Sequence, residues 1–377
     1  MTLLRANSYL CDLPVYQPGR PIEEVARELG LDASRIIKLA SNENPHGPSP
    51  RAIEVMKNVV PDVHRYPDGT SFHLRKAVAR KHGLDPEQIV FGNGSNELIE
   101  LVGHAFLKPG DEMIISQYAF AIYEIVGRLF QAKIVEVPAK NYGHDFERML
   151  DAIGPSTRVM FVANPNNPTG TVSSAERLQE LILAVPEHVL LVVDEAYQDF
   201  LEKPLDSAAL IRPGQKKPGR DNLLILRTFS KAHGLAGLRI GYGLARPPVA
   251  AALERVRQPF NANAVAQAAA EAALNDNAHI RKTFILNAEG RARLEEGLHR
   301  LGFDFVPSFG NFVLLNVGGG QAVFDCLLRR GVIVRPMGGY KLPGFIRVSV
   351  GTAAENERFI AELSKLNPPS MQKKKNT

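Results

Sequence analysis

Seven short apolar runs, separated by stretches with helical character, constrain the fold of this chain more than any other feature. The runs are Ile89–Phe91, Met113–Ile115, Ile134–Val137, Val159–Ala163, Val189–Val193, Leu223–Leu226 and Ile240–Leu244. They lack the alternation of apolar and polar residues of a half-exposed strand, which is typical of strands buried on both faces. Such strands alternating with helices predict an α/β fold with a seven-stranded, mostly parallel sheet covered by helices on both faces.

The pattern changes after about residue 246. Residues 247–301 are mainly helical and rich in alanine, and short strands follow at Phe312–Asn316, Val332–Arg335 and Phe345–Val350. The length of 377 residues also favours two domains. We therefore predict an N-terminal arm (1–45) that packs with the smaller domain, a large ligand-binding domain (46–265), a smaller α+β domain (266–368) and a disordered tail (369–377).

Charge and cysteine content exclude several classes of protein. The 45 basic and 40 acidic residues give a net charge of +5, and without Lys373–Lys375 it would be +2. This is too close to neutral for a surface that binds nucleic acid or anionic membrane. Cys11 and Cys326 stand far apart, and no histidine spacing matches a metal site, so we expect neither disulfides nor a metal. With no membrane-spanning or signal-like segment, we expect a cytoplasmic protein.

In a doubly wound sheet the ligand crevice lies beyond the carboxyl ends of the strands, so the residues after each apolar run are the most informative. Gly92–Ser95 follow the first run and precede a helix. The free N–H groups of that helix, with the Ser95 hydroxyl, would suit a phosphate. Glu97 takes the place of the third glycine of a dinucleotide motif, and no P-loop lysine follows. A glycine turn with a capping serine explains the same residues equally well.

Two further motifs follow the next runs of the sheet. Asn164–Gly170 presents amide side chains after the run ending at Ala163, although this is also the composition of a tight turn. Asp194 ends the run that begins at Val189. A carboxylate at the end of an apolar strand is costly unless a cation pairs with it. The alternative is an aspartate that caps the following helix.

Lys231 follows the run Leu223–Leu226, with hydroxyl groups at Thr228 and Ser230 and with Arg239 eight residues further on. A partly desolvated lysine loses basicity and becomes a nucleophile, although a lone lysine on a loop is usually solvated. A phosphate seat, an amine, a buried carboxylate and the nearby Tyr197 together match the phosphate, aldehyde, ring nitrogen and phenolic oxygen of pyridoxal 5′-phosphate. We therefore predict this cofactor.

The sequence resembles the fold-type I pyridoxal-phosphate aminotransferases and, within them, the histidinol-phosphate aminotransferase family. The resemblance extends over residues 16–351, nearly the whole chain. It rests on the motifs Tyr16–Gly19, Ala40–Pro45, Arg65–Gly69, Asn164–Gly170, Asp194–Tyr197, Ser230–Arg239 and Arg347–Gly351.

The resemblance implies roles around the cofactor. Lys231 would bond covalently to the cofactor aldehyde and later move the substrate's proton, and Asp194 would hold the protonated ring nitrogen. Tyr197 completes the catalytic set, and together with Asn167 it would donate to the phenolic oxygen. Tyr118 would stack on the ring. The phosphate-binding residues would be Gly94, Ser95, Asn96, Thr228, Ser230 and Arg239.

The resemblance also implies a homodimer, because Tyr66 would reach the cofactor phosphate of the neighbouring subunit. Strand alternation places Arg347 opposite the core face, where it faces either the cleft or, as an edge-strand residue, solvent. In the family this arginine would bind the substrate carboxylate or phosphate, with Arg335 as a second cation. Tyr16 and Asn44 are also placed beside the substrate. The implied reaction is reversible amino transfer between L-histidinol phosphate and 2-oxoglutarate, giving imidazole acetol phosphate and L-glutamate.

Alternative functions share much of this site. An aromatic amino-acid aminotransferase and a threonine-phosphate decarboxylase would use the same residues around the cofactor ring. A cofactor-binding regulator would normally add a DNA-binding segment with clustered basic residues, which the body of the chain lacks. Glu97 disfavours a nucleotide-dependent oxidoreductase.

Overall fold

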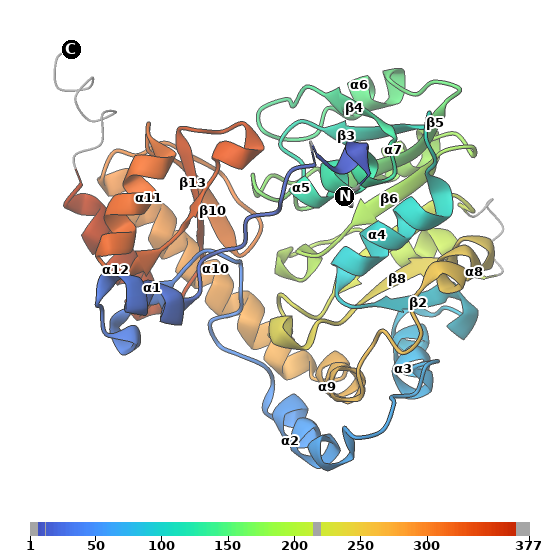
Figure 1. Ribbon diagram of the computed structural model, residues 1–377, viewed down its shortest axis with the longest axis horizontal. Helices are drawn as coiled ribbons and strands as arrows, with labels where there is room; N and C mark the ends of the chain where they lie inside the picture. Colours follow the sequence, from blue (N-terminus) through green and yellow to red (C-terminus); the bar gives the residue numbers. More distant parts are fainter. Residues whose placement is uncertain (1–6, 12, 214–219, 367–377) are drawn as a thin grey trace, which may run out of the picture.

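A seven-stranded mixed sheet forms the centre of the larger of two units (Figure 1), in a computed structural model that describes residues 7–11, 13–213 and 220–366. Its strand order is β2-β8-β7-β6-β5-β3-β4. The strands are β2 (Ile89–Gly92), β3 (Glu112–Ser116), β4 (Lys133–Val137), β5 (Thr157–Ala163), β6 (Leu190–Asp194), β7 (Leu223–Thr228) and β8 (Gly241–Ala245). Only β8 runs antiparallel to its neighbours. The predicted fold class is therefore confirmed, and each predicted run matches a strand to within two residues.

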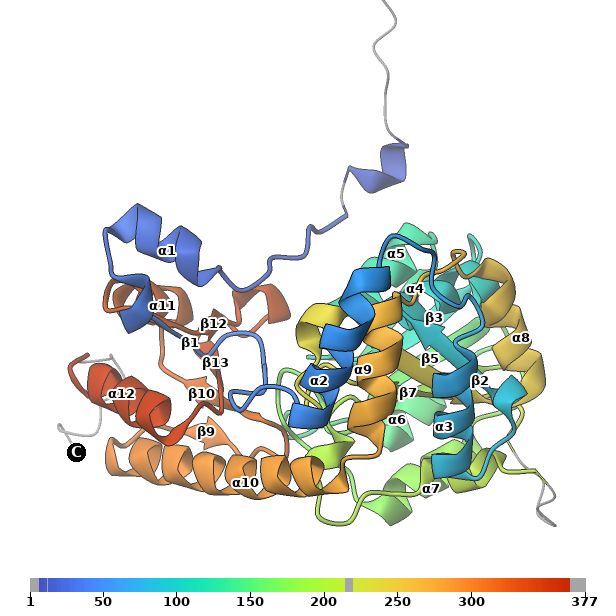
Figure 2. The ribbon, with the colours of Figure 1, turned by 90° about the horizontal axis from the view of Figure 1, so that it is seen from below.

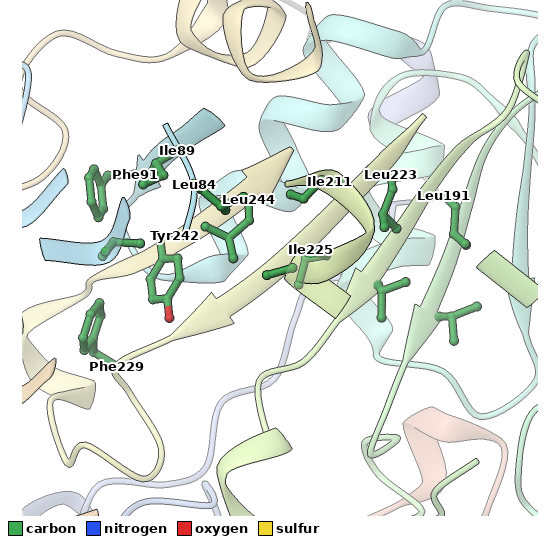
Figure 3. Packing of buried hydrophobic residues seen from close by; sticks show 14 of the residues in the cluster. Leu84, Ile89, Phe91, Leu191, Ile211, Leu223, Ile225, Phe229, Tyr242 and Leu244 are labelled. Carbon is green, nitrogen blue, oxygen red and sulfur yellow. The ribbon is translucent and has the colours of Figure 1, made fainter. Parts of the chain in front are cut away.

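Helices cover both faces of this sheet, because successive side chains of each strand enter different cores. Val159 and Phe161 of β5 face one core, whereas Met160 and Val162 face the other. The first core includes α4 (Ser95–Phe106), α5 (Ala121–Leu129) and α8 (Pro247–Val256). The second includes α2 (Pro50–Val59), α3 (Phe72–His82), α6 (Phe146–Asp151), α7 (Ala175–Ala184) and α9 (Ala264–Leu274). Figure 3 shows part of the second core, where Ile225 and Tyr242 lie among other buried side chains.

The smaller unit is built on a four-stranded antiparallel sheet with the order β12-β13-β10-β9. Its elements are β9 (Phe305–Val306), β10 (Phe312–Asn316), β12 (Arg335–Pro336), β13 (Phe345–Ser349), α10 (Asn277–Arg300), α11 (Gly320–Arg329) and α12 (Ala353–Ser364). The strand predicted at Val332–Arg335 is divided in two. Its first half, β11 (Val332–Ile333), pairs instead with β1 (Ile37–Lys38) of the arm. Two-residue strands have no periodicity of their own, so their distant partners could not be read from the sequence.

Helix α9 belongs to the larger unit, not to the smaller one as the predicted boundary at 265 implied. It packs against α2 and α3 (Figure 2), and buries Ala266, Ala269, Ala270 and Ala273 in the core of the larger unit. Small side chains at this helical spacing let two helices approach closely. The boundary between the units therefore falls near Asn275, where α9 ends.

The N-terminal arm contacts both units (Figures 1 and 2). Val25 of α1 (Ile22–Leu29) and Leu39 lie in the core of the smaller unit, as the predicted arm required. The first described turn, Ser8–Leu10, lies against α5 of the larger unit. The tail predicted at 369–377 lies outside the described residues. Within the described ranges, no helix is both long and apolar enough to cross a membrane.

Candidate active site

A cavity of about 460 Å³ opens between the two units, beyond the carboxyl ends of β5, β6 and β7. It brings together most of the residues that the sequence singled out. The predicted residues on its wall are Tyr16, Ser95, Asn96, Asn167, Asp194, Tyr197, Thr228, Ser230, Lys231, Arg239, Arg335 and Arg347. A single pocket thus holds two arginines on the side of the smaller unit, and a carboxylate, an amine and a third arginine on the side of the larger unit.

Asp194 is the last residue of β6 and is buried. Its carboxylate accepts hydrogen bonds from the Tyr123 hydroxyl (2.8 Å) and from the Ala196 amide (3.0 Å). Burial raises the pKa of Asp194 above its ordinary value, whereas these two bonds and the positive charge of Lys231 act in the opposite direction. In the described part of the chain no basic side chain forms an ion pair with it. A cationic group in the cavity would therefore stabilise this carboxylate.

Lys231 lies in the loop that follows β7 (Leu223–Thr228). Its Nζ donates to the carbonyl of Ser41 (3.1 Å) and stands 5.6 Å from the centre of the Tyr197 ring. Burial, followed by the positive charge of Arg347, lowers the pKa of Lys231 to about 8. At pH 7 about a tenth of this amine is therefore neutral, far more than for an ordinary lysine, and the neutral form is the one that attacks a carbonyl carbon.

The first turn of α4 and Arg239 form an anion-binding corner. Helix α4 begins at Ser95 after Gly94, which has a φ of 76° and provides no side-chain cap. A Cβ at Gly94 would lie 2.5 Å from Nη2 of Arg239, so glycine lets the guanidinium approach the helix terminus. Arg239 also donates to the Ser230 hydroxyl (3.4 Å). A guanidinium beside free helix N–H groups suits a phosphate dianion.

Glu97 does not oppose this corner, although it lies in the first turn of the same helix. Its carboxylate accepts hydrogen bonds from the amide of Asn93 (2.5 Å) and from Nδ2 of Asn261 (2.6 Å). The two donors hold the Glu97 carboxylate at a position that does not line the cavity. The phosphate seat expected from the sequence therefore has the required donors.

The smaller unit contributes two arginines from neighbouring strands. Arg335 of β12 and Arg347 of β13 are paired in register, which places both guanidinium groups at one end of the cavity. Arg347 is buried and donates to Oδ1 of Asn167 and to the carbonyl of Ala40 (2.9 Å). Its Nε is buried and has no hydrogen-bond partner among the described residues. Arg335 lies over the ring of Tyr16, 5.3 Å from its centre.

Four predicted site residues do not line the cavity: Gly94, Tyr118, Asn44 and Tyr66. Tyr118 has a φ of 59°. Its ring packs against an apolar cluster at the edge of the smaller unit, and the ring centres of Tyr118 and Tyr142 are 5.9 Å apart. Phe120 takes the place on the cavity wall that Tyr118 was expected to occupy. Asn44 donates to the carbonyl of Ala232 (3.0 Å), so it stabilises the loop that carries Lys231 and does not itself line the cavity. Its neighbour in the same motif, Asn42, lines the cavity instead.

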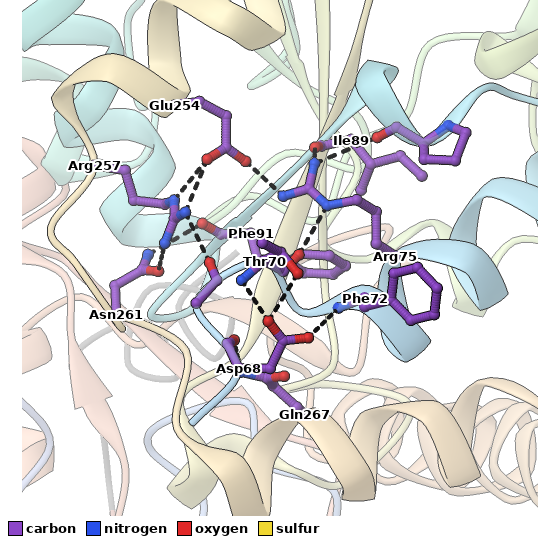
Figure 4. Close-up of polar contacts among 12 residues, drawn as sticks. Asp68, Thr70, Phe72, Arg75, Ile89, Phe91, Glu254, Arg257, Asn261 and Gln267 are labelled. Atoms are coloured by element: carbon purple, nitrogen blue, oxygen red, sulfur yellow. Dashed lines mark hydrogen bonds and ion pairs between the residues drawn. The ribbon is translucent and has the colours of Figure 1, made fainter. Parts of the chain in front are cut away.

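Tyr66 lies on the surface and not in the cavity of its own chain. It is 83% exposed and stacks on Phe260, with ring centres 4.7 Å apart. Hydrogen bonds fix the loop that presents it (Figure 4): Asp68 accepts from the amides of Thr70 and Phe72, both at 2.8 Å. Figure 4 also shows the neighbouring Arg257, whose Nη2 donates to the carbonyl of Gly69 (3.0 Å). The loop therefore holds an aromatic side chain in an outward-facing position.

Sequence reasoning missed several residues of the site. Tyr123, Asn42, Ser41 and Phe120 all contact the cavity or its principal side chains. Tyr123 stands three residues after Phe120, the N-cap residue of α5, and this spacing of about one helical turn places both on the cavity wall. Ser41 contributes only its carbonyl, and no side-chain pattern could have indicated it.

The residues that line the cavity fit pyridoxal 5′-phosphate. The buried Asp194 carboxylate lacks a cationic partner in the described chain, the Lys231 amine has a lowered pKa, and Arg239 adjoins a helix terminus. These match the ring nitrogen, the aldehyde and the phosphate of that cofactor.

Comparison with known proteins agrees with this geometry. The sequence pattern of the family described as aminotransferase class I and II matches residues 34–363. The chain is 51% identical over 361 residues to a histidinol-phosphate aminotransferase of Methylobacillus flagellatus, covering 96% of this chain and 97% of that protein. A protein of the same name from Akkermansia muciniphila is 48% identical over 362 residues, covering 96% and 98%.

Solved structures show the same fold. The histidinol-phosphate aminotransferase of Sinorhizobium meliloti in complex with pyridoxal-5′-phosphate superposes with a TM-score of 0.88 at 29% identity, covering 97% of this chain and 98% of that one. An aspartate aminotransferase from Thermus thermophilus with maleate gives a TM-score of 0.82 at 25% identity, covering 96% and 100%.

Proposed function

Because the chain belongs to the class I and II aminotransferase family, we propose that it is a pyridoxal-phosphate-dependent histidinol-phosphate aminotransferase. It transfers an amino group reversibly between L-histidinol phosphate and 2-oxoglutarate, giving imidazole acetol phosphate and L-glutamate. Full-length relatives at about half identity bear this name. The observation that carries the proposal is the pairing of Arg335 with Arg347 on adjacent strands, which provides two cations for one anionic substrate.

The cofactor, when bound, supplies an aldehyde that condenses with amines and a ring that withdraws electrons from the substrate's Cα. Asp194 would hold the ring nitrogen in its protonated form, because a cation there offsets the burial of its carboxylate. Asn167 and Tyr197 would donate to the phenolic oxygen. The first turn of α4, Ser230 and Arg239 would hold the phosphate. Thr228 would assist by accepting from the Ser230 amide (3.1 Å), which orients that loop.

Lys231 is the proton carrier of the proposed mechanism. Its pKa of about 8 suits an amine that would accept the proton from the substrate's Cα and donate it to the carbon of the cofactor's former aldehyde group. Arg347 contributes to this property by its positive charge, the second cause of the lowered pKa. The residue that binds the substrate anion therefore also keeps the catalytic amine less basic.

Substrate choice would be made by the smaller unit and the arm. The buried Nε of Arg347 has no hydrogen-bond partner among the described residues, so it would donate to the substrate anion. A guanidinium binds a carboxylate or a phosphate with two parallel hydrogen bonds. Arg335 adds a second charge, which a phosphate dianion uses better than a monoanionic carboxylate does. Tyr16, partly exposed and stacked on Arg335, would cover the outer end of the substrate.

We also propose a homodimer in which Tyr66 reaches the cofactor phosphate of a second copy. Support comes from its exposure on a hydrogen-bonded loop and from exposed apolar neighbours, Val60, Val63, Phe72 and Phe260. Light scattering should then give twice the chain mass of 41.4 kDa. A cytoplasmic location is proposed as well, because the exposed thiols of Cys11 and Cys326 stay reduced there.

An assay with two amino donors tests the proposed substrate. With 2-oxoglutarate as acceptor, kcat/KM for L-histidinol phosphate should exceed that for L-phenylalanine by at least about a hundredfold, the worth of charge-assisted hydrogen bonds to a phosphate. Arg335→Gln should lower the first value and leave the second nearly unchanged. Equal rates for both donors would indicate an aromatic amino-acid aminotransferase. Release of CO2 without an acceptor would indicate a decarboxylase.

A further inference from the structure

The hydroxyl of Tyr197 is tied to a residue of the arm. Asn42 is 1% exposed and donates from Nδ2 to the Tyr197 oxygen at 2.9 Å. Its backbone has a φ of 53°, which asparagine tolerates better than most residues. Ser349, on β13 of the smaller unit, contacts the same asparagine twice. A short chain of hydrogen bonds therefore connects Ser349 of β13, Asn42 of the arm and Tyr197, which lies three residues after the end of β6.

The direction of each hydrogen bond in this chain is determined. The Ser349 hydroxyl oxygen accepts from the backbone amide of Asn42 (2.8 Å), and its proton goes to Oδ1 of Asn42 (3.2 Å). The other amide atom, Nδ2, is the donor to Tyr197. A tyrosine hydroxyl has one proton, so an oxygen that accepts from Asn42 has its proton free for another acceptor. Because Tyr197 lines the cavity, an acceptor bound in the cavity can receive that proton.

We propose that Asn42 is a positioning residue that holds the Tyr197 hydroxyl with its proton directed into the cavity, toward the phenolic oxygen of the cofactor. The inference rests on the proposed function, because it needs that cofactor. Burial raises the pKa of Tyr197 above its ordinary value, whereas the charge of Arg347 and then the hydrogen bond from Asn42 act in the opposite direction. The charged groups that face Tyr197 are Asp194, Lys231 and Arg347.

The proposal predicts a spectroscopic effect. A donor to the phenolic oxygen stabilises its negative charge most when the neighbouring nitrogen has lost its proton, so the donor lowers the pH midpoint at which the visible absorbance of the holoenzyme changes. Asn42→Gly removes the side chain and accepts a φ of 53° without strain. It should raise that midpoint by about one pH unit, the worth of one hydrogen bond to a charged group.

A double-mutant cycle separates positioning from other effects. Tyr197→Phe alone should also raise the midpoint, and Asn42→Gly should add nothing in that background. Asn42→Asp, nearly isosteric, reverses the hydrogen bond and should raise the midpoint further. The part of that rise due to its charge would persist in the Tyr197→Phe background. Ser349→Ala, which frees the Asn42 amide to turn, should give a smaller rise of the same sign.

Asn141→Gly is the matched control, because Asn141 also has a left-handed backbone (φ 50°) but lies exposed on a loop. The pH midpoint of the visible absorbance should be the same in this variant as in the wild-type protein. Thermal unfolding of each cofactor-free variant checks the fold, and Ser349→Ala carries the test should Asn42→Gly not fold. An unchanged midpoint, or an equal shift with and without the Tyr197 hydroxyl, would overturn the positioning role. A wild-type protein that acquires no visible absorbance with pyridoxal 5′-phosphate would instead refute the proposed function.

Discussion

The two walls of the cavity are built in different ways. On the larger unit's wall, Asp194 and Lys231 follow the carboxyl ends of adjacent parallel strands, so the sheet itself sets their spacing. On the smaller unit's wall, contacts join residues far apart in sequence. Arg347, for example, is 180 residues from Asn167 and 307 residues from Ala40. The first wall depends on backbone topology, and the second on the docking of two units and an arm.

This difference separates chemistry from selectivity. The groups proposed to hold the cofactor ring and to move protons lie mostly on the sheet, where rigid strands hold catalytic groups in place. The groups proposed to recognise the substrate anion, Arg335, Arg347 and Tyr16, lie on the smaller unit and the arm. Substitutions on the first wall should affect every substrate alike, whereas those on the second should affect KM more than kcat.

The largest effect is expected from Lys231→Ala. Among the described residues on the cavity wall Lys231 has the one amine, so turnover without it should fall by at least about three orders of magnitude with either amino donor. Lys133→Ala is the matched control, because Lys133 is exposed and pairs only with Glu112. Steady-state rates with L-histidinol phosphate and with L-glutamate measure both. A Lys231→Ala enzyme that retains near-normal rates would remove the proposed mechanism.

A smaller effect is expected from Arg347→Lys on the other wall. Lysine keeps the positive charge but has a single nitrogen in place of the planar guanidinium. It therefore cannot hold Asn167 and the Ala40 carbonyl and at the same time bind the substrate anion with two parallel hydrogen bonds. KM for both L-histidinol phosphate and 2-oxoglutarate should therefore rise about tenfold to a hundredfold, with a lesser change in kcat.

The control for this variant is Arg330→Lys. Arg330 is an exposed residue of the same unit that pairs with the partly buried Glu362, and its replacement should leave KM unchanged. A fall in kcat at constant KM for Arg347→Lys would show that the smaller unit's wall also serves the chemical step, and would contradict the division between the walls.

The same division explains what the sequence could predict. Every strand of the large sheet, and the placement of Asp194 and Lys231 beyond it, could be predicted because apolar runs and strand ends are local signals. The pairing of β1 with β11 could not, since it depends on the docking of the arm. Nor could the division of the predicted run Val332–Arg335, whose last residue begins β12 and pairs with β13 instead. Tyr118 was predicted to stack on the cofactor ring, because the sequence does not show the left-handed backbone (φ 59°) at this residue, whose ring does not line the cavity.

Asn42 and Asn44 illustrate the same limit within one motif. Both have the same side chain, and only the φ of 53° at Asn42 directs it to the cavity while Asn44 turns toward Ala232. The boundary near Asn275 was misplaced for a related reason. An alanine-rich helix has no strong amphipathic pattern, so its partner helices α2 and α3 were visible only in the structure.

The smallest predicted effect tests whether the two walls act independently. In the cofactor-free protein the fraction of neutral Lys231 should rise with pH through about 8, because burial and Arg347 lower the pKa of this amine below its ordinary value. The rate at which the protein captures pyridoxal 5′-phosphate, fixed by borohydride reduction, should follow the same curve. Arg347→Gln removes a positive charge and should move the midpoint of that curve upward, whereas Arg330→Gln should not. An unchanged midpoint would mean that Arg347 does not influence the pKa of Lys231. The two walls would then affect each other only when a substrate is bound between them.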